Sequence, residues 1–327
     1  MIKIKNIFDK IKGKEIIIIG DSMVDSYVIG EINRNSPEAP VPIVDIQKEE
    51  AKLGGAANVA LNIQSLGMKP ILCSVIGKDE DGKNFLEICN DNNLDTSGIL
   101  VDRERKTTNK KRVIVDKKHI LRIDNEHTNL LNDEIFDRFL KNIEGLISDD
   151  QIIIFQDYDK GVIEKKLINK VKKMGNKLFI AVDPKRRNFF DYEDIDLFKP
   201  NLNEILDAYK TEDKSISNIN HISDKLKREK NIKNLMVTLS DKGLIINNNK
   251  GFIHNKIEKK KIIDVSGAGD TVISLATILF YLDLPEKFIA EMCNLAGGIT
   301  CMKSGVNAIN LKELLENAER NNLDLYL

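Results

Sequence analysis

The chain has no tryptophan, few cysteines and histidines, and no long apolar run. Four scattered histidines without an HExxH motif disfavour a zinc hydrolase. No apolar run approaches the roughly 20 residues of a membrane-spanning helix, and the block from Ile16 to Ile19 is too short for a signal-peptide core. The cysteines form neither a CxxC pair nor a disulfide framework, which indicates reduced, mostly buried thiols: Cys73, Cys89, Cys293 and Cys301. We therefore expect a cytoplasmic protein with no membrane partner.

The chain also lacks an excess of charge of either sign. Its 327 residues include 50 Lys and Arg against 51 Asp and Glu, which gives a formal charge of −1. This balance provides no broad electrostatic field for nucleic acid, so no nucleic-acid partner is expected. Hydrophobic residues at 42% and charged residues at 31% are typical of a globular protein with a substantial core.

Short apolar runs that end in polar residues recur along the chain. They cover residues 15–20, 151–155, 178–182, 194–198 and 235–237. Because the runs lack polar alternation, they are typical of strands buried on both faces of a parallel sheet. Stretches with helical periodicity lie between them, at 132–147 and 162–173. The pattern predicts an α/β fold, with an open, mostly parallel sheet and helices on both faces.

Polar residues follow these runs. In open α/β sheets, ligands bind beyond the carboxyl ends of the strands. For any one residue the alternative is that it merely ends a strand and caps the next helix. Together they predict a ligand site at one edge of the sheet, formed by Asp21, Asp157, Asp183, Asn201, Thr238 and Ser240.

Two segments interrupt the alternation of strands and helices. Residues 27–53 form an extended stretch with three prolines, and residues 99–123 are typical of a β-hairpin that turns at 116–118. Neither fits a parallel core strand, because the first is broken by proline and the second is half polar. We predict that they form a small β lid over one end of the sheet.

The sequence Asp264-Val-Ser-Gly-Ala-Gly-Asp270 precedes an apolar helical run. A Gly-Ala-Gly turn at a helix N-terminus leaves backbone N–H groups uncovered, which suits an anion. An Asp directly after it can take a proton from a hydroxyl beside a phosphate, so the motif suits phosphoryl transfer. The alternative is a glycine-rich turn in which the helix dipole favours the Asp. A GxxxxGK[ST] motif and a GxGxxG after the first strand are both missing, which disfavours a P-loop enzyme and a dinucleotide-binding oxidoreductase.

A second motif of small residues, Gly54-Gly-Ala-Ala-Asn58, leads into a helical run that ends at Gly67. Small residues at a helix start allow a ligand to approach closely. Asn58 can donate to and accept from sugar hydroxyls, although a capping or solvated asparagine is the alternative.

Together these two motifs resemble those of the ribokinase/PfkB family of sugar kinases. Within that family the chain is most similar to the D-glycero-β-D-manno-heptose 7-phosphate kinase branch. Five segments carry this similarity: Gly20-Asp-Ser-Met-Val-Asp25, Asn35-Ser-Pro-Glu-Ala-Pro-Val-Pro-Ile43, Gly54-Gly-Ala-Ala-Asn-Val-Ala60, Asp157-Tyr-Asp-Lys-Gly161 and Asp183-Pro-Lys185. The resemblance implies a ribokinase-like fold, with one kinase domain over residues 1–327 and lid segments at about 27–53 and 99–123.

The resemblance also implies roles for matching residues. Asp270 is the base that activates the sugar hydroxyl, and the anion hole is formed by Gly267, Ala268 and Gly269. The sugar is held by Asp21, Asp25, Gly54, Gly55 and Asn58. The ATP site comprises Lys185, Asn201, Thr238, Ser240, Gly243, Asp264 and Asn294, and Mg²⁺ is organised through waters by Asn201 and Glu204. Alternatives stay open for four of these: Asn201 and Glu204 also fit a plain capping box, Lys185 a solvated basic patch, and Asn294 an ordinary polar position on a helix.

A phosphorylated sugar also needs cations for its own phosphate. Arginine grips phosphate with two parallel hydrogen bonds, and Arg112 and Arg122 on the expected lid hairpin are the first candidates. The alternative is that they are ordinary basic residues of a solvent-facing strand.

The reaction implied by the resemblance is phosphoryl transfer from ATP to the anomeric C1 hydroxyl of D-glycero-D-manno-heptose 7-phosphate. It would serve nucleotide-activated heptose synthesis for surface polysaccharide. The expected partners are a second copy of the chain, bound through the lid, and a separate nucleotidyltransferase, because some relatives carry such a domain fused after the kinase. Activation by a monovalent cation is left open. Two alternatives remain: a PfkB-type kinase for another sugar, phosphosugar or nucleoside, and a non-catalytic nucleotide- or sugar-binding regulator on the same fold.

Overall fold

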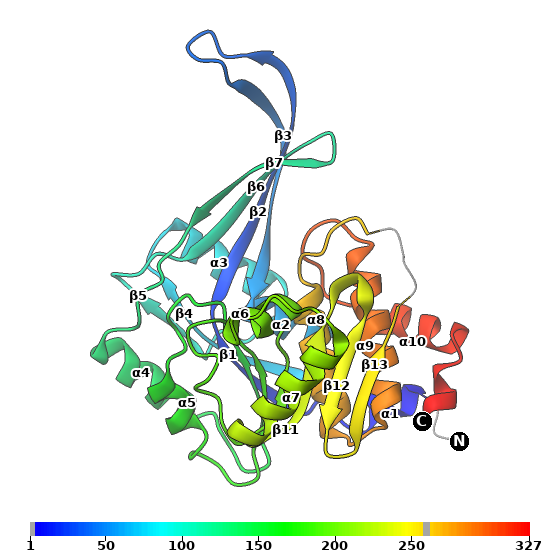
Figure 1. Cartoon of the computed structure of the whole chain (residues 1–327). Coiled ribbons are helices and arrows are strands. Elements are labelled where there is room, and N and C mark those ends of the chain that lie inside the picture. The colour runs from blue at the N-terminus through cyan, green and yellow to red at the C-terminus, as the bar shows by residue number, and fades with distance from the viewer. Residues whose placement is uncertain (1–3, 258–261) are drawn as a thin grey trace.

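A nine-stranded sheet forms the centre of the computed structural model, which describes residues 4–257 and 262–327 (Figure 1). The strand order is β13-β12-β11-β10-β9-β8-β1-β4-β5, parallel from β11 to β5, with β12 and β13 antiparallel at one edge. The strands are β1 (Glu15–Gly20), β4 (Lys69–Gly77), β5 (Ile99–Asp102), β8 (Ile152–Gln156), β9 (Phe179–Asp183), β10 (Ile195–Phe198), β11 (Ile232–Thr238), β12 (Leu244–Asn248) and β13 (Gly251–Asn255). The predicted α/β class is confirmed.

The apolar runs of the parallel strands are buried on both faces, as their sequence predicts. In β1, Ile16 and Ile18 belong to one hydrophobic core, whereas Ile17 and Ile19 belong to a second core on the opposite face. The first core is covered by α1 (Ile4–Asp9), α2 (Ala56–Ser65), α3 (Glu80–Asp91), α8 (Ala268–Tyr281), α9 (Glu286–Cys301), α10 (Leu311–Arg320) and η2 (Leu323–Tyr326). The second core is covered by α4 (Asp133–Glu144), α5 (Lys165–Val171), α6 (Leu202–Ala208) and α7 (Ile216–Lys230).

A separate four-stranded sheet forms the lid, which rises from the central sheet (Figure 1). Its strand order is β3-β2-β6-β7, with the long strands β2 (Ser22–Asn35) and β3 (Pro42–Gly55) beside β6 (Thr108–Val115) and β7 (Lys118–Asn125). The predicted hairpin turns between β6 and β7. Pro37 and Pro40 lie between β2 and β3, and Pro42 is the first residue of β3, so none of these prolines interrupts a lid strand.

The expected limits of both lid segments differ from the observed ones. Residues 99–102 form β5, a parallel strand at the edge of the central sheet, whereas the lid strands of this segment begin only at Thr108. Three of the four residues of β5 are apolar, but a run this short does not identify the sheet to which it belongs. The other lid segment is longer than predicted, because β2 starts at Ser22 and β3 ends at Gly55.

The cysteines agree with the prediction of reduced, mostly buried thiols. All four are unpaired, and only Cys301 is partly exposed. Within residues 4–257 and 262–327, none of the helices has the length and apolar character needed to cross a membrane.

Candidate active site

The carboxyl ends of the parallel strands bring together the polar residues that the sequence singles out. Because β11, β10, β9, β8 and β1 are successive neighbours, the residues that end or follow them lie along one edge of the sheet: Thr238, Asn201, Asp183, Asp157 and Asp21. Asn201 forms a β-bridge with Thr238, which joins the ends of β10 and β11 directly. Ser240 follows in the short 3₁₀ turn η1 (Ser240–Lys242).

Asp270 lies in the first turn of α8, pointing into the molecule with only 3% of its surface exposed. Three side chains donate hydrogen bonds to its carboxylate. Asn58 Nδ2 lies 2.7 Å from Oδ2, while Tyr158 Oη and Gln156 Nε2 lie 2.8 Å and 3.1 Å from Oδ1. A carboxylate held in this way has a fixed orientation, as a general base requires.

Burial raises the pKa of Asp270 from 3.8 to about 7. The hydrogen bonds from Asn58 and Tyr158 act against this rise, and so does the nearby Lys199, whereas the charge of Asp183 adds to it. A base whose pKa lies near the working pH combines a useful ionised fraction with a strong pull on a proton.

The N-terminus of α8 is open to an anion. Its N-cap residue, Gly267, has a left-handed backbone (φ 78°) and provides no side-chain cap for the N–H groups that follow. A Cβ at Gly267 would lie 2.9 Å from Asn58 Nδ2, whereas at Gly269 the nearest atoms would be 3.9 Å away, on Asp183 and Lys199. The predicted cradle is therefore open at Gly269, whereas Gly267 packs against Asn58 and the Ala268 N–H donates to the Val265 carbonyl over 3.3 Å.

A buried ion pair adjoins this cradle. Lys199 Nζ lies 3.0 Å from Asp183 Oδ2, and both side chains are almost fully buried. Gln156 Nε2 also donates to Asp183 Oδ2 over 3.3 Å, so the same amide links Asp183 to Asp270.

Asp21, expected to hold the sugar, is hydrogen-bonded to a neighbouring loop. Its oxygens accept from the backbone N–H groups of Tyr158, Lys160 and Val162 at 2.8, 3.0 and 3.0 Å. Burial raises the pKa of Asp21, and these hydrogen bonds oppose the rise. The carboxylate thus fixes the loop after β8, including Tyr158.

On the lid, Asp25 and Arg112 form a buried ion pair. Burial raises the pKa of Asp25, although Arg112 acts in the opposite direction. Gly54 fits tightly beside this pair, since a Cβ there would lie 2.1 Å from Asp25 Oδ2. Gly55 has a positive φ of 60° at the N-cap of α2, so the backbone requires glycine there, whereas Gly54 is required by the side chains of Asp25 and Met23.

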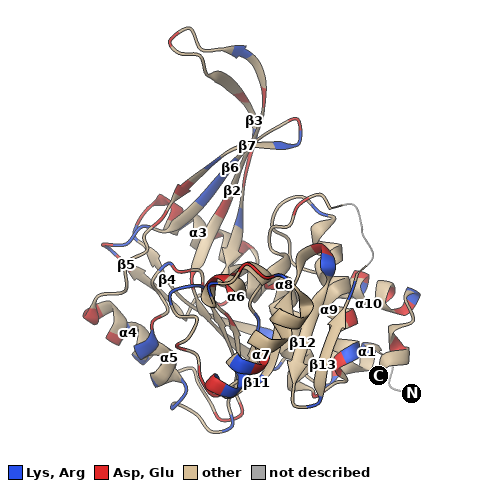
Figure 2. Cartoon of the chain, in the orientation of Figure 1, with Lys and Arg blue, Asp and Glu red and all other residues tan. Residues whose placement is uncertain are grey.

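The two candidate phosphate arginines differ in environment. Arg122 lies opposite Arg112 in the lid register but is exposed, with two hydrogen bonds to Asp124. A third cation, which the sequence analysis missed, is Lys52, register partner of Asp25 on β3. Its Nζ donates to Asn307 Oδ1 over 3.0 Å, and it forms no salt bridge with any residue in the described ranges. Basic and acidic residues are interspersed over the lid strands (Figure 2).

On the nucleotide side, the capping-box alternative for Asn201 and Glu204 is observed. Asn201 Oδ1 accepts from the Glu204 N–H over 2.9 Å, and Glu204 Oε2 accepts from the Asn201 N–H over 2.7 Å. The second oxygen of Glu204 pairs with Lys185. Among the residues described, no three His, Cys, Asp or Glu side chains gather into a metal cage. A single carboxylate beside a phosphate site still fits Mg²⁺, which keeps waters and binds through few protein ligands plus phosphates.

Other predicted ATP-site residues are engaged in backbone contacts. Asn294 Nδ2 donates to the Asn255 carbonyl over 3.0 Å. Asp264 accepts from the N–H groups of Ser266 and Gly305, both at 2.9 Å, and so holds two loops together. Gly243 (φ 88°) turns the chain into β12, where a Cβ would lie 2.0 Å from the Asn255 oxygen.

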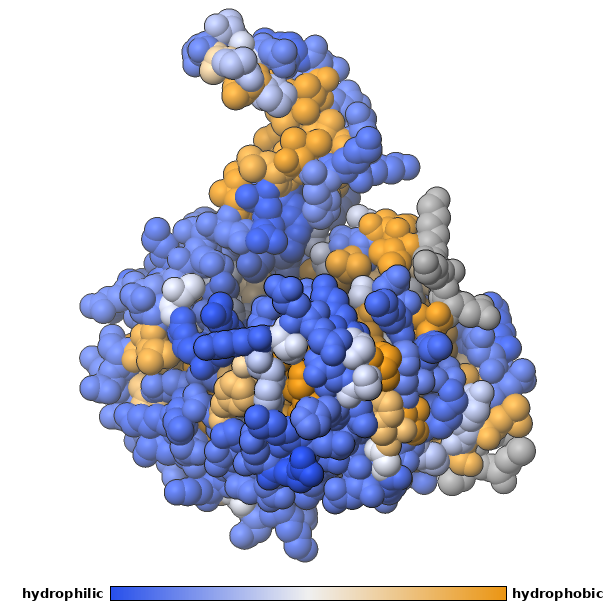
Figure 3. Space-filling view, in the orientation of Figure 1, coloured by the Kyte–Doolittle hydropathy of each residue, from blue (hydrophilic) through white to orange (hydrophobic). Residues whose placement is uncertain are grey.

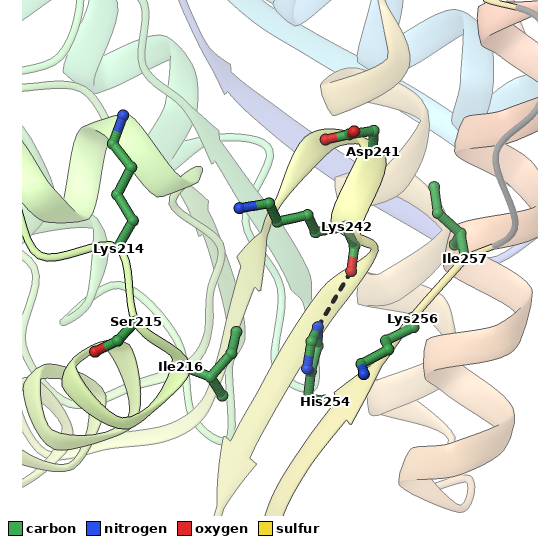
Figure 4. A pocket seen from close by; sticks show the side chains of 8 residues that line it. All are labelled: Lys214, Ser215, Ile216, Asp241, Lys242, His254, Lys256 and Ile257. Carbon is green, nitrogen blue, oxygen red and sulfur yellow. Dashed lines mark hydrogen bonds between the residues drawn. The ribbon is translucent and has the colours of Figure 1, made fainter.

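A cavity of about 360 Å³ opens beside the turn at Ser240–Lys242 (Figure 4). Lysine ammonium groups surround it, and His254 Nε2 lies 3.1 Å from the Lys242 carbonyl oxygen. Its lining residues are Lys214, Ser215, Ile216, Asp241, Lys242, His254, Lys256 and Ile257. The sequence analysis named Ser240 and Gly243 beside this cavity but none of its lining residues.

Gln156, Tyr158 and Lys199 are the other site residues that sequence reasoning missed. Gln156 and Tyr158 flank Asp157, and Lys199 follows β10, so each stands at a strand end that the analysis already marked. The signal that could have found these three residues is their position, since side chains at the carboxyl ends of the parallel strands face one edge of the sheet.

Known proteins resemble the chain over most of its length. The profile of the pfkB family carbohydrate kinases matches residues 14–313. The "Bifunctional protein HldE" of Helicobacter pylori (strain P12) is 36% identical over 303 residues, which cover 92% of this chain and 66% of that protein. The protein of the same name from Sulfurimonas denitrificans is 35% identical over 307 residues, covering 92% and 63%. The chain thus spans about two thirds of the length of these relatives.

Solved structures share the fold at low sequence identity. Phosphofructokinase-2 from Escherichia coli, in complex with potassium, superposes with a TM-score of 0.79 at 17% identity, over 95% of this chain and 99% of that one. Ribokinase from Arabidopsis thaliana, complexed with ribose and ATP, gives 0.70 at 16% identity, over 93% and 99%. By its profile match and its relatives at more than 30% identity, the chain belongs to the PfkB family of carbohydrate kinases and is an ATP-dependent sugar kinase.

Proposed function

We propose that this kinase transfers the γ-phosphoryl group of MgATP to the C1 hydroxyl of D-glycero-D-manno-heptose 7-phosphate. The observation that carries the chemistry is the buried carboxylate of Asp270, held at the open N-terminus of α8. The assignment of the sugar is supported by the motifs shared with the heptose 7-phosphate kinase branch. It is also supported by 36% identity to HldE over 92% of the chain. The product would enter nucleotide-activated heptose synthesis, in which a nucleotidyltransferase acts later.

Each part of the site has a function in this reaction. Asp270 accepts the proton of the sugar hydroxyl, and the N-terminus of α8 at the Gly267–Gly269 turn would face the charge that develops on the transferring phosphoryl group. Lys185, which pairs with Glu204, would meet a nucleotide phosphate, and Glu204 and Asn201 would hold Mg²⁺ through waters. Mg²⁺ supplies neutralisation of phosphate charge. A monovalent cation is not required by any of these contacts, and its effect is tested by omitting potassium from the assay.

The C7 phosphate would bind at the lid. Arg112 is the nearer arginine, because it lies in the site paired with Asp25, whereas Arg122 faces solvent. Lys52 is the third candidate, since it stands beside the site without a carboxylate partner among the described residues. A phosphate that arrives between Arg112 and Lys52 would compete with Asp25 for the guanidinium.

The lid also provides a surface for a second copy of the chain. Figure 3 shows apolar side chains along its outer part. Large apolar side chains are exposed there at Ile32, Val41, Ile46, Ile120, Leu121 and Ile123. Apolar surface that stays open on a β-sheet marks an association site, so we propose a homodimer in which two lids pack together. Light scattering should give twice the chain mass of 37.0 kDa, and the double variant Ile46→Asp, Leu121→Asp should give the single mass.

The substrate is tested by ADP release with MgATP over a panel of sugars. The panel contains D-glycero-D-manno-heptose 7-phosphate, sedoheptulose 7-phosphate, fructose 6-phosphate, ribose and adenosine, with Asp270→Asn as the inactive control. Turnover confined to the manno-heptose 7-phosphate supports the proposal. Turnover on an unphosphorylated sugar would keep the kinase and remove the lid phosphate site. Binding of sugar and ATP without turnover would favour the non-catalytic regulator.

A further inference from the structure

The two oxygens of the Asp270 carboxylate are not equivalent. Oδ1 accepts two hydrogen bonds, from Tyr158 Oη and Gln156 Nε2, whereas Oδ2 accepts one, from Asn58 Nδ2. A carboxylate oxygen has two lone pairs. Oδ1 is therefore saturated by protein donors, and Oδ2 keeps one lone pair for a hydroxyl that enters the site.

The Gln156 amide can only be oriented with its Nε2 toward Asp270. The same nitrogen also lies 3.3 Å from Asp183 Oδ2, so both neighbours of this amide nitrogen are carboxylate oxygens. An amide oxygen turned toward two carboxylates would find no donor there. The two carboxylates around it therefore fix Gln156 as a hydrogen-bond donor to Oδ1 of Asp270.

The phenol of Tyr158 is held just as firmly. Its backbone N–H is bound by Asp21 Oδ2 at 2.8 Å, and Lys185 Nζ lies 5.3 Å from the centre of its ring. Burial raises the pKa of Tyr158 well above 10, and the charges of Asp270, Asp183 and Asp25 act in the same direction. The hydroxyl therefore stays protonated and remains a donor over the working pH range.

We propose that Tyr158 is a positioning residue which, with Gln156, fills Oδ1 of Asp270 and so makes Oδ2 the oxygen that receives the substrate proton. This inference rests on the proposed function, in which Asp270 is the base. As the bond from the sugar oxygen to the γ-phosphorus forms, the sugar O–H bond breaks and its proton passes to Oδ2. The bond from the γ-phosphorus to the bridging oxygen breaks, and ADP leaves with the electron pair.

The titration of Asp270 reports on this arrangement. The charged or titratable groups around the carboxylate are Tyr158 after β8, Asp183 at the end of β9, Lys185 just beyond it and Lys199 after β10, while Asn58 and Gln156 are neutral. Since the Tyr158 hydrogen bond stabilises the ionised carboxylate, its loss raises the pKa of Asp270 further. Lys199 and Asp183 stay in place and contribute equally in the wild type and the variant.

The test is the dependence of kcat/KM for the sugar on pH, from 5.5 to 9.5, in wild type and Tyr158→Phe at saturating MgATP. The phenylalanine keeps the ring that Lys185 faces and removes only the hydroxyl. Tyr192→Phe is the matched control, because the Tyr192 hydroxyl likewise donates to a buried carboxylate, that of Asp157, over 3.1 Å.

We expect the rising limb of the profile to lie near pH 7 in the wild type and in Tyr192→Phe. In Tyr158→Phe it should move up by about one pH unit, which lowers the rate about tenfold at pH 6 and less above pH 9. Gln156→Leu, which removes the other donor to Oδ1, should give the same upward movement and serves if Tyr158→Phe does not fold.

An unchanged profile in both Tyr158→Phe and Gln156→Leu, with melting temperatures lowered as in Tyr192→Phe, overturns the inference and leaves these residues as structural. The proposed function fails separately, if Asp270→Asn retains turnover. Loss of turnover in Asp270→Asn together with an unmoved Tyr158→Phe profile would thus reject the positioning role alone.

Discussion

Relative to the wild type, the variant Asp270→Asn should become more stable as the pH rises, although it lacks the catalytic base. Burial raises the pKa of this carboxyl from 3.8 to about 7. The folded state therefore binds the proton more tightly than the unfolded chain does, and the contribution of Asp270 to stability falls as the pH rises from about 4 through 7. Linkage sets the whole loss at about 4 kcal/mol as an upper limit.

Asparagine carries no charge and escapes this loss. Its side chain has one acceptor oxygen, whereas three groups donate to the carboxylate in the wild type: Asn58, Gln156 and Tyr158. A buried donor that is left without an acceptor lowers the free energy of unfolding by about 1–3 kcal/mol, and this cost is the same at every pH. The difference in stability between variant and wild type should therefore change with pH even if its absolute value is small. Between pH 5 and pH 8 the change is about 3 kcal/mol in favour of the variant.

The assay is thermal unfolding without ligand at pH 5, 6, 7 and 8. For a chain of this length about 3 kcal/mol corresponds to roughly 6 °C in the difference of melting temperatures. Asp137→Asn, which removes an exposed carboxyl on α4, is the control and should show no comparable trend. A difference between Asp270→Asn and wild type that stays constant from pH 5 to pH 8 would refute a raised pKa for Asp270.

Four further substitutions test the geometry around the site. Gly54→Ala should lower sugar turnover at least tenfold, because the new Cβ would lie 2.1 Å from a carboxylate oxygen of Asp25; steady-state kinetics on the folded variant measures this. Gly267→Ala should destabilise by about 1–3 kcal/mol in urea, since its φ is 78° and its Cβ has no room, whereas Gly269→Ala should fold normally yet weaken ATP turnover by covering the cradle. Lys199→Met should cost about 3–5 kcal/mol, because it leaves a buried carboxylate without its partner, and equal urea midpoints for variant and wild type would contradict this.

The central sheet could be predicted because most of its strands are recognisable from a few consecutive residues. Ile16 to Ile19 are buried whichever face they point to, so an unbroken apolar run is enough to identify β1. The strands β4 and β12 were not predicted, because Pro70 interrupts the apolar run of β4 and two asparagines, at 247 and 248, end that of β12. The 99–102 segment was assigned to the lid because pairing partners lie outside any local window.

The site divides in the same way. Asp270 and its glycines could be found because the chemistry lies in seven consecutive residues. The contacts that hold Asp270 could not, since Asn58 and Tyr158 stand 212 and 112 positions away and meet it only after the sheet has formed. The same holds for Arg112, whose pairing with Asp25 spans 87 positions.

The single residue between the central sheet and the lid has a mechanical consequence. β1 ends at Gly20 and β2 begins at Ser22, so at this crossing Asp21 is the one residue between the two strands, while on the return path β3 runs directly into α2 at Gly55 and Ala56. A strand of 14 residues is about 47 Å long, and a rotation of 5° at this pivot would carry its tip by about 4 Å. Asp21, the pivot, is one of the residues expected to hold the sugar. A small displacement of Asp21 would therefore produce a much larger displacement at the tip of the lid. A fluorophore pair with one dye near residue 38 and the other on α10 would read substrate binding as a change of distance.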